Sequence, residues 1–165
     1  MTVTESAATA LPGGEASSSA QSPSLSKLLG LEVKHLLVGL DIAAGMLRRG
    51  EQDKAMRMYA ALVFCEPTEI RFQVGLASCA LEMKEYHLAM QAASAIVSFF
   101  PDNPVGYFIS GRAAFGLRDL DAAIGDLREA VRLAEAAGDT AMQRDASSIL
   151  ERAVIAGEMR AQAAQ

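Results

Sequence analysis

Residues 70–103 read IRFQVGLASCALEMKEYHLAMQAASAIVSFFPDN, and this stretch decides the fold. Two mostly apolar segments flank the polar turn Lys84-Glu85-Tyr86. Pro101 ends the second segment, because proline cannot continue a helix and disfavours the helical conformation before it. Ala77 and Ala89 place one small side chain in each segment, which lets two backbones approach closely. The stretch predicts two close-packed helices joined by a short turn.

The same pattern recurs every 34 residues, in the units 36–69, 70–103 and 104–137. A period of 34 is typical of the tetratricopeptide repeat, a unit of two helices, A and B. We therefore predict an all-α tetratricopeptide solenoid of three repeats. The shared small residues are Ala43, Ala77 and Gly111 at the eighth position, and Ala55, Ala89 and Ala123 at the twentieth.

The twenty-fourth position of each unit is expected to fill the space beside these small residues. It holds Tyr59 in the first unit and Leu127 in the third, but Ala93 in the second. We expect Phe99 or Phe100 to fill the space that Ala93 leaves.

The two ends of the chain differ from the repeats. Residues 1–24 are rich in Ala, Ser, Gly and Pro and predict a disordered tail, while residues 138–165 predict a helix that caps the solenoid. Residues 25–35 predict an N-terminal helical segment with more leucine than a simple cap needs. Its apolar residues are therefore candidate homodimer contacts, with capping alone as the alternative: Leu25, Leu28, Leu29 and Val33.

Composition and charge exclude several classes of protein. The net charge is −5 and no block of basic residues appears, so we expect no nucleic-acid partner. No apolar run is long enough for a membrane-spanning helix, so we expect no direct membrane insertion. No secretory signal is visible, and Cys65 and Cys79 form no disulfide framework, which favours a cytosolic protein.

No set of residues for catalysis can be assembled. His35 and His87 each stand alone on a predicted helix, and the two cysteines lack the short paired spacing of a zinc site. No glycine-rich phosphate loop follows a strand. We expect a protein that is not an enzyme and has no catalytic residues, no metal and no cofactor.

The helices A of such an array line a concave groove, where an extended peptide could bind. The predicted groove is mostly apolar, with Arg71 and Arg112 as isolated cations. Leu40 and Ala44 stand where arrays that grip acidic C-terminal peptides have polar residues, so that clamp is absent. The alternative is that the N-terminal segment or a second copy covers these residues. The candidate groove residues are Leu37, Leu40, Ala44, Leu47, Arg71, Val74, Ser78, Leu81, Val105, Phe108, Arg112 and Phe115.

The stretch from Arg71 to Ala89 resembles the second repeat of class II type III secretion chaperones. An Arg-Phe pair opens it, a Gly-Leu-small-small-Cys run follows, and Tyr86-x-x-Ala89 ends it. The resemblance implies a bacterial cytosolic chaperone that holds hydrophobic translocator proteins in its groove and keeps them from aggregating. It implies that Phe108 and Phe115 wall an anchor pocket, and it is consistent with a homodimer. The alternative is a tetratricopeptide scaffold or regulatory subunit of a secretion or envelope assembly.

Overall fold

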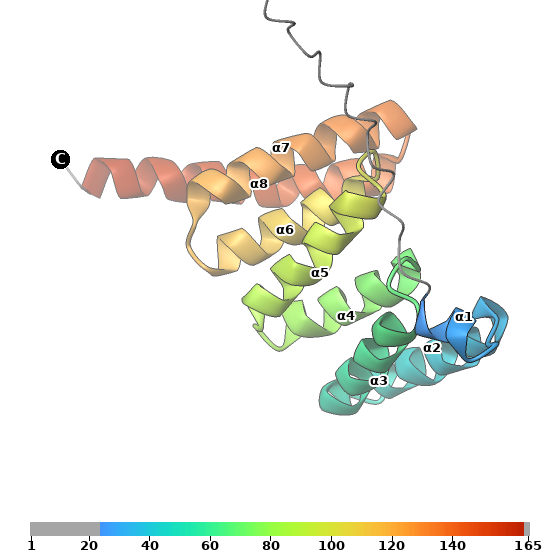
Figure 1. Cartoon of the computed structure of the whole chain (residues 1–165). Coiled ribbons are helices and arrows are strands. Elements are labelled where there is room, and N and C mark those ends of the chain that lie inside the picture. The colour runs from blue at the N-terminus through green and yellow to red at the C-terminus, as the bar shows by residue number, and fades with distance from the viewer. Residues whose placement is uncertain (1–23, 164–165) are drawn as a thin grey trace, which may run out of the picture.

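The computed structural model describes residues 24–163, and these residues form a stack of helices without strands. The tail expected over residues 1–24 therefore lies outside the described residues, except for Ser24. Figure 1 shows the helices stacking pair by pair in chain order. The helices are α1 (Leu25–Leu28), α2 (Val33–Arg48), α3 (Gln52–Cys65), α4 (Ile70–Glu82), α5 (Tyr86–Phe99), α6 (Pro104–Gly116), α7 (Leu120–Ala137) and α8 (Thr140–Ala163).

The predicted solenoid of three tetratricopeptide repeats is confirmed in the described part of the chain, with α2–α3, α4–α5 and α6–α7 as its pairs. Helices α3, α5 and α7 begin at Gln52, Tyr86 and Leu120, so each begins 34 residues after the one before it. Among the described elements, α2 touches α4, α4 touches α6 and α6 touches α8. This contact between successive helices A places α2, α4, α6 and α8 on the inner side of the curve.

Three equivalent turns set the 34-residue spacing. Gly50, Lys84 and Arg118 each follow a helix A, and their φ angles are 76°, 62° and 66°. Only Gly50 has the residue type that this left-handed conformation favours. Of the helices that follow these turns, α7 has a side-chain cap, because the side chain of Asp119 accepts from the Ala122 amide. Helix α6 is capped in the same way by Asn103, whose side chain accepts from the Val105 amide.

The small residues lie where helices A and B cross, as predicted. Ala43, Ala55, Ala77, Ala89 and Ala123 have no exposed surface. A Cβ atom added to Gly111 would lie 2.6 Å from Cγ of Leu127 and 3.2 Å from the carbonyl oxygen of Ala123. A larger residue at any of these crossings would force the two helices apart.

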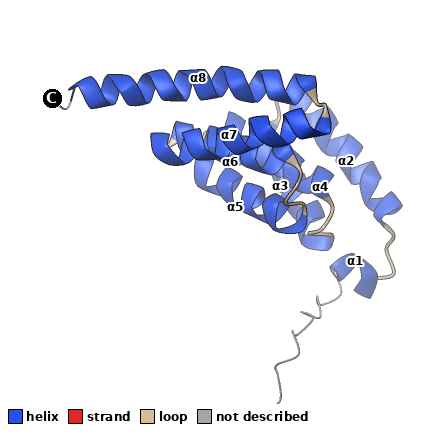
Figure 2. Ribbon diagram, turned by 90° about the horizontal axis from the view of Figure 1, so that it is seen from above, coloured by secondary structure: helices blue, strands red, loops and turns tan. Residues whose placement is uncertain are grey.

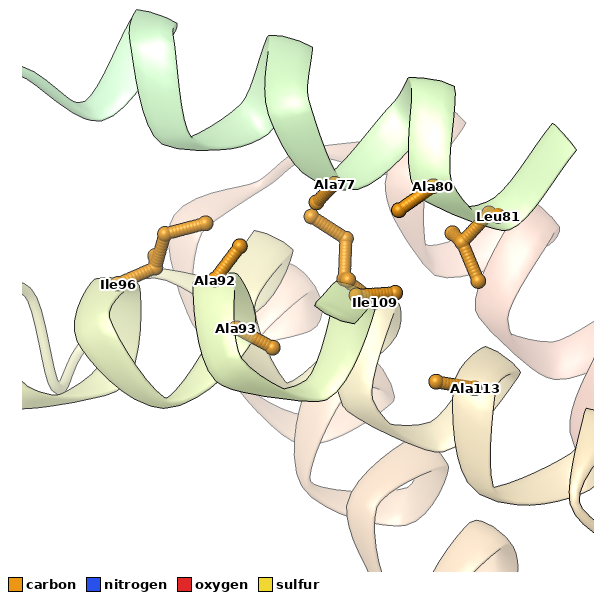
Figure 3. Packing of buried hydrophobic residues seen from close by; sticks show 9 residues of the cluster. Ala77, Ala80, Leu81, Ala92, Ala93, Ile96, Ile109 and Ala113 are labelled. Atoms are coloured by element: carbon orange, nitrogen blue, oxygen red, sulfur yellow. The ribbon is translucent and has the colours of Figure 1, made fainter. Parts of the chain in front are cut away.

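The space beside Ala93 is not filled as predicted. Neither Phe99 nor Phe100 belongs to the buried cluster that contains Ala93 or packs against it, and Phe99 is 39% exposed. Ile109 of α6, which is 3% exposed, belongs to that cluster together with Ala77 and Ala93. Figure 3 shows the alanines of α4 and α5 close to Ile109. A residue from the next repeat thus supplies the volume, whereas Phe99 is the last residue of α5 and is partly exposed to solvent.

A buried carboxylate holds α1 against the end of α3. Glu66 is 5% exposed, and its oxygens accept hydrogen bonds from the hydroxyls of Ser24, Ser26 and Thr68. Burial by itself raises the pKa of this carboxyl, but the hydroxyl groups outweigh it and hold the pKa below its ordinary value. These hydrogen bonds fix a helix of only four residues, which is too short to be stable alone.

Helix α8 continues the inner row instead of lying across the end. It packs along α7 and touches α6, and its C-terminal end extends past α7 in both views (Figures 1 and 2). The helix buries Ala146 and Ala153. It therefore covers the last repeat, as the predicted cap does, while also adding residues to the inner face. None of the described helices combines the length and hydropathy that crossing a membrane requires.

Candidate functional site

The candidate site is the inner face formed by α2, α4, α6 and α8. Most of the predicted groove residues are half-buried, so each shares its surface between the core and solvent. This holds for Leu37, Leu40, Ala44, Leu47, Val74, Ser78, Val105, Phe108 and Phe115. An extended segment laid on this face would cover the remaining apolar surface.

In the first repeat, the predicted groove leucines also stabilise the fold. Leu37, Leu40 and Leu47 pack against a buried cluster that includes Phe72 and Leu76. Val74 and Val105 pack in the same way against the cluster that contains Ile96 and Ile109. Truncating these side chains would therefore change stability as well as any binding.

Ala44, Ser78 and Arg112 occupy the ninth position of the three repeats and belong to no buried cluster among the described residues. Ala44 and Ser78 are half-buried and small, and Arg112 is exposed. A substitution at the ninth position should therefore change the inner face without removing contacts of the buried core.

Arg71 is not the isolated cation that the sequence predicts. Its Nε lies 2.7 Å from Oε1 of Glu69 and its second terminal nitrogen lies 2.8 Å from Oε2, so the pair is bidentate. The Arg71 guanidinium holds the pKa of the Glu69 carboxyl below its usual range. The charge of Arg71 is thus matched within its own turn, two residues from its partner.

Phe108 and Phe115 lie on the inner row but also contribute to the core beneath α8. Both pack against a buried cluster of Ala114, Ala123, Leu127 and Ala153. They stay candidate walls of a client pocket. Replacing both with alanine would remove core contacts as well, so that double variant cannot separate binding from stability.

A hollow on this face lies between the C-terminal ends of α4 and α6 and the middle of α8. Its volume is about 540 Å³, and it brings together three predicted groove residues, Leu81, Arg112 and Phe115. Leu81 is only 9% exposed and is the most buried of these three. Gly116, which holds another groove-facing position of helix A in the third repeat, lines the hollow too. The sequence interpretation missed the other lining residues, which are Tyr86, Arg118, Ile149 and Arg152.

Two reasons explain these omissions. Ile149 and Arg152 lie on α8, which the sequence predicts only as a cap, although their spacing of three residues places them on one helix face. Tyr86 is the first residue of α5 and Arg118 lies in the turn before α7, so a search of helix-A positions leaves both out. Gly116 accommodates the ring of Tyr86, because a Cβ there would lie 2.4 Å from two of its atoms.

No group of three or more His, Cys, Asp or Glu side chains in residues 24–163 could hold a metal ion. Cys79 is fully buried, and burial raises the pKa of its thiol to about 11, so little thiolate forms near neutral pH. Cys65 and Cys79 are both free thiols.

The chain has the fold of the type III secretion translocator chaperones. It superimposes on a type III secretion complex from Aeromonas hydrophila with a TM-score of 0.77 and 22% identity, covering 83% of this chain and 92% of that one. It matches SycD, a translocator chaperone of Yersinia enterocolitica, with a TM-score of 0.74 and 21% identity over 79% and 98% of the two chains.

PcrH from Pseudomonas aeruginosa is similar with a TM-score of 0.71 and 25% identity over 76% of this chain and 96% of its own. PcrH has also been solved in complex with the chaperone-binding region of PopD. No protein-family model matches the sequence, and no curated protein matches it. The resemblance predicted from the stretch Arg71–Ala89 is thus confirmed at the level of the fold.

Proposed function

We propose that this protein is a cytosolic type III secretion chaperone that binds an extended segment of hydrophobic translocator proteins on its inner face. The observation that carries the proposal is this row of half-buried apolar side chains on α2, α4 and α6. These side chains still expose apolar surface to water, and a partner that covers this surface gains binding free energy. The shared fold with SycD and PcrH supports the same role.

The proposed mechanism is that of a holding chaperone without chemistry. Burial contributes about 25 cal/mol per Å² of apolar surface, so three or four apolar anchors offset the cost of ordering a client segment. Covering these anchors removes from water the surface through which clients would aggregate. Neither a cofactor nor a catalytic residue takes part.

Charged substitutions at the ninth position test this proposal. We expect Ala44→Glu with Ser78→Glu to abolish retention of client, because two carboxylates would stand on the apolar inner face without partners. The assay co-expresses the chain with the two translocator proteins of the same secretion system and measures the translocator in the soluble fraction. Circular dichroism confirms that the variant is folded.

The matched control is Ala60→Glu with Ser94→Glu, which adds the same charges at exposed positions of α3 and α5. This control should retain the translocators like the unaltered chain. Equal retention by both double variants would show that the inner face does not bind the client. If the unaltered chain fails to keep a translocator soluble but co-purifies with folded parts of the secretion apparatus, the protein is a scaffold instead.

A further inference from the structure

Three arginines line the hollow at the C-terminal end of the inner face. Arg112 comes from α6, Arg118 from the turn before α7, and Arg152 from α8. Apolar side chains lie between them, because Leu81, Phe115 and Ile149 line the same space. Positive charge and apolar surface are thus combined in one cavity of about 540 Å³.

No acidic side chain in residues 24–163 forms an ion pair with any of these three arginines. By contrast, Arg49, Arg71, Arg132 and Arg160 each pair with a carboxylate. The chain as a whole has an excess of acidic residues, with a net charge of −5. A local group of unpaired arginines in an acidic protein is therefore a local site of positive potential.

Aromatic rings hold two of the three guanidiniums in place. The guanidinium carbon of Arg112 lies 5.4 Å from the ring centre of Phe108, and that of Arg152 lies 5.6 Å from the ring centre of Phe115. Contact with a ring positions the cation but does not neutralise its charge. The donors are thus oriented before a ligand arrives, which lowers the entropy lost on binding.

The third arginine occupies a position that favours glycine. Arg118 has a φ of 66° and corresponds to Gly50 of the first repeat, so it adopts the left-handed conformation at some cost in backbone energy. Lys84 takes the same place in the second repeat with a φ of 62°, but it does not line the hollow. These two residues provide a matched pair for mutagenesis.

We propose that this hollow binds an acidic side chain of the client segment, with a neighbouring apolar side chain against Leu81, Phe115 and Ile149. The inference rests on the proposed function and adds the chemistry that fixes the position of the segment along the groove. An Asp or Glu carboxylate fits because guanidinium groups bind it through paired, charge-assisted hydrogen bonds. Because the chain as a whole is acidic, this group of three arginines favours one register of the client along the groove.

Selection from a random 12-residue peptide library displayed on phage tests this inference with the full chain. We expect the selected peptides to be enriched in Asp or Glu next to a large apolar residue. Arg112→Gln with Arg152→Gln should abolish the acidic preference, and Arg118→Gly should weaken it while relieving the strained turn. In the best synthetic peptide, Glu→Gln should lower affinity about fivefold to tenfold, and 0.5 M NaCl should reduce this difference.

Two controls match these variants. Arg57→Gln with Arg132→Gln removes the same charge from α3 and α7, and Lys84→Gly makes the same turn substitution one repeat earlier; both should keep the acidic preference. Apolar peptides selected without acidic residues would overturn this inference alone, as would an unchanged preference in the variant of Arg112 and Arg152. Selection of apolar peptides alone is also the result expected if residues 1–23 or a second copy of the chain, and not the client, fills the hollow. Selection of no peptide at all would overturn the proposed function together with it.

Discussion

At the scale of single residues, Gly75 and Tyr59 set the distance between the first two repeats. Tyr59 of α3 is 4% exposed, and a Cβ added to Gly75 of α4 would lie 2.1 Å from its ring. Because Gly75 has no side chain, the ring of Tyr59 can occupy the space next to its Cα atom. Between the second and third repeats the sizes are reversed, because Ala93 and Ile109 occupy the equivalent positions.

Gly75→Ala should destabilise the protein by about 1–3 kcal/mol, because the added methyl group overpacks a filled interface. Chemical denaturation followed by circular dichroism measures the change in the free energy of unfolding. Gly125→Ala is the control, since a Cβ there meets no atom within 4 Å. In the interior of α7 this control should stabilise the helix by about 0.5–1 kcal/mol. Equal effects of the two substitutions would contradict the assigned packing.

At the scale of elements, the attachment of α1 depends on side-chain hydrogen bonds more than on buried apolar surface. Leu28 and Leu29 are 68% and 62% exposed, whereas Ser26 is 1% exposed and donates to Glu66. Because the folded pKa of Glu66 is lowered, its contribution to stability is fully present above the unfolded pKa and is lost as the pH falls through the folded pKa. The docking of α1 is therefore sensitive to acid.

Glu66→Ala should release α1 while leaving the rest of the array folded. Amide hydrogen exchange over residues 24–31 should become at least about tenfold faster, because two charge-assisted hydrogen bonds to α1 are lost. In the unaltered chain, the same release should appear as the pH falls below the ordinary glutamate pKa of about 4.3, after correction for the intrinsic exchange rate. Glu82→Ala, at an exposed position of α4, should change neither result. Unchanged protection in Glu66→Ala would refute the role of this carboxylate.

At the scale of the whole molecule, the two ends of the solenoid are capped differently, by the short helix α1 at the first repeat and by the long helix α8 at the last. Helix α8 covers the last repeat and exposes Ile155 and Met159 toward its own C-terminal end, and α1 and α2 leave large apolar side chains exposed at the first repeat. Val38 and Ile42 of α2 are 62% and 46% exposed, and Leu28 and Leu29 are exposed as well. This arrangement keeps dimerisation through the N-terminal region as a prediction, and it adds two residues to the candidates Leu25, Leu28, Leu29 and Val33.

Leu28→Glu with Leu29→Glu should convert a homodimer into a monomer, because two carboxylates would face their own copies across the interface. Light scattering coupled to size exclusion gives the mass directly. Phe64→Glu is the control, since Phe64 of α3 is 75% exposed and should not alter the mass. A monomeric unaltered chain would leave capping as the role of the segment. A dimer that only Phe64→Glu disrupts would move the interface to α3.

The sequence by itself determined the repeat architecture of this protein. A period of 34 places small residues at every crossing of helices A and B, and any other register would put larger side chains there. Most of the candidate groove follows from the same period, because it fixes which side of helix A faces inward. Because the repeats have the same length, the helix crossings and the groove positions can be predicted from the sequence without coordinates.

Only the tertiary structure decided which residues meet across repeats. It replaced Phe99 with Ile109 as the neighbour of Ala93, paired Arg71 with Glu69, and joined Arg118 and Arg152 to the hollow beside Arg112. None of these departures follows the 34-residue period. Side-chain direction and the bend of each turn set these contacts, and both depend on how complete helices pack.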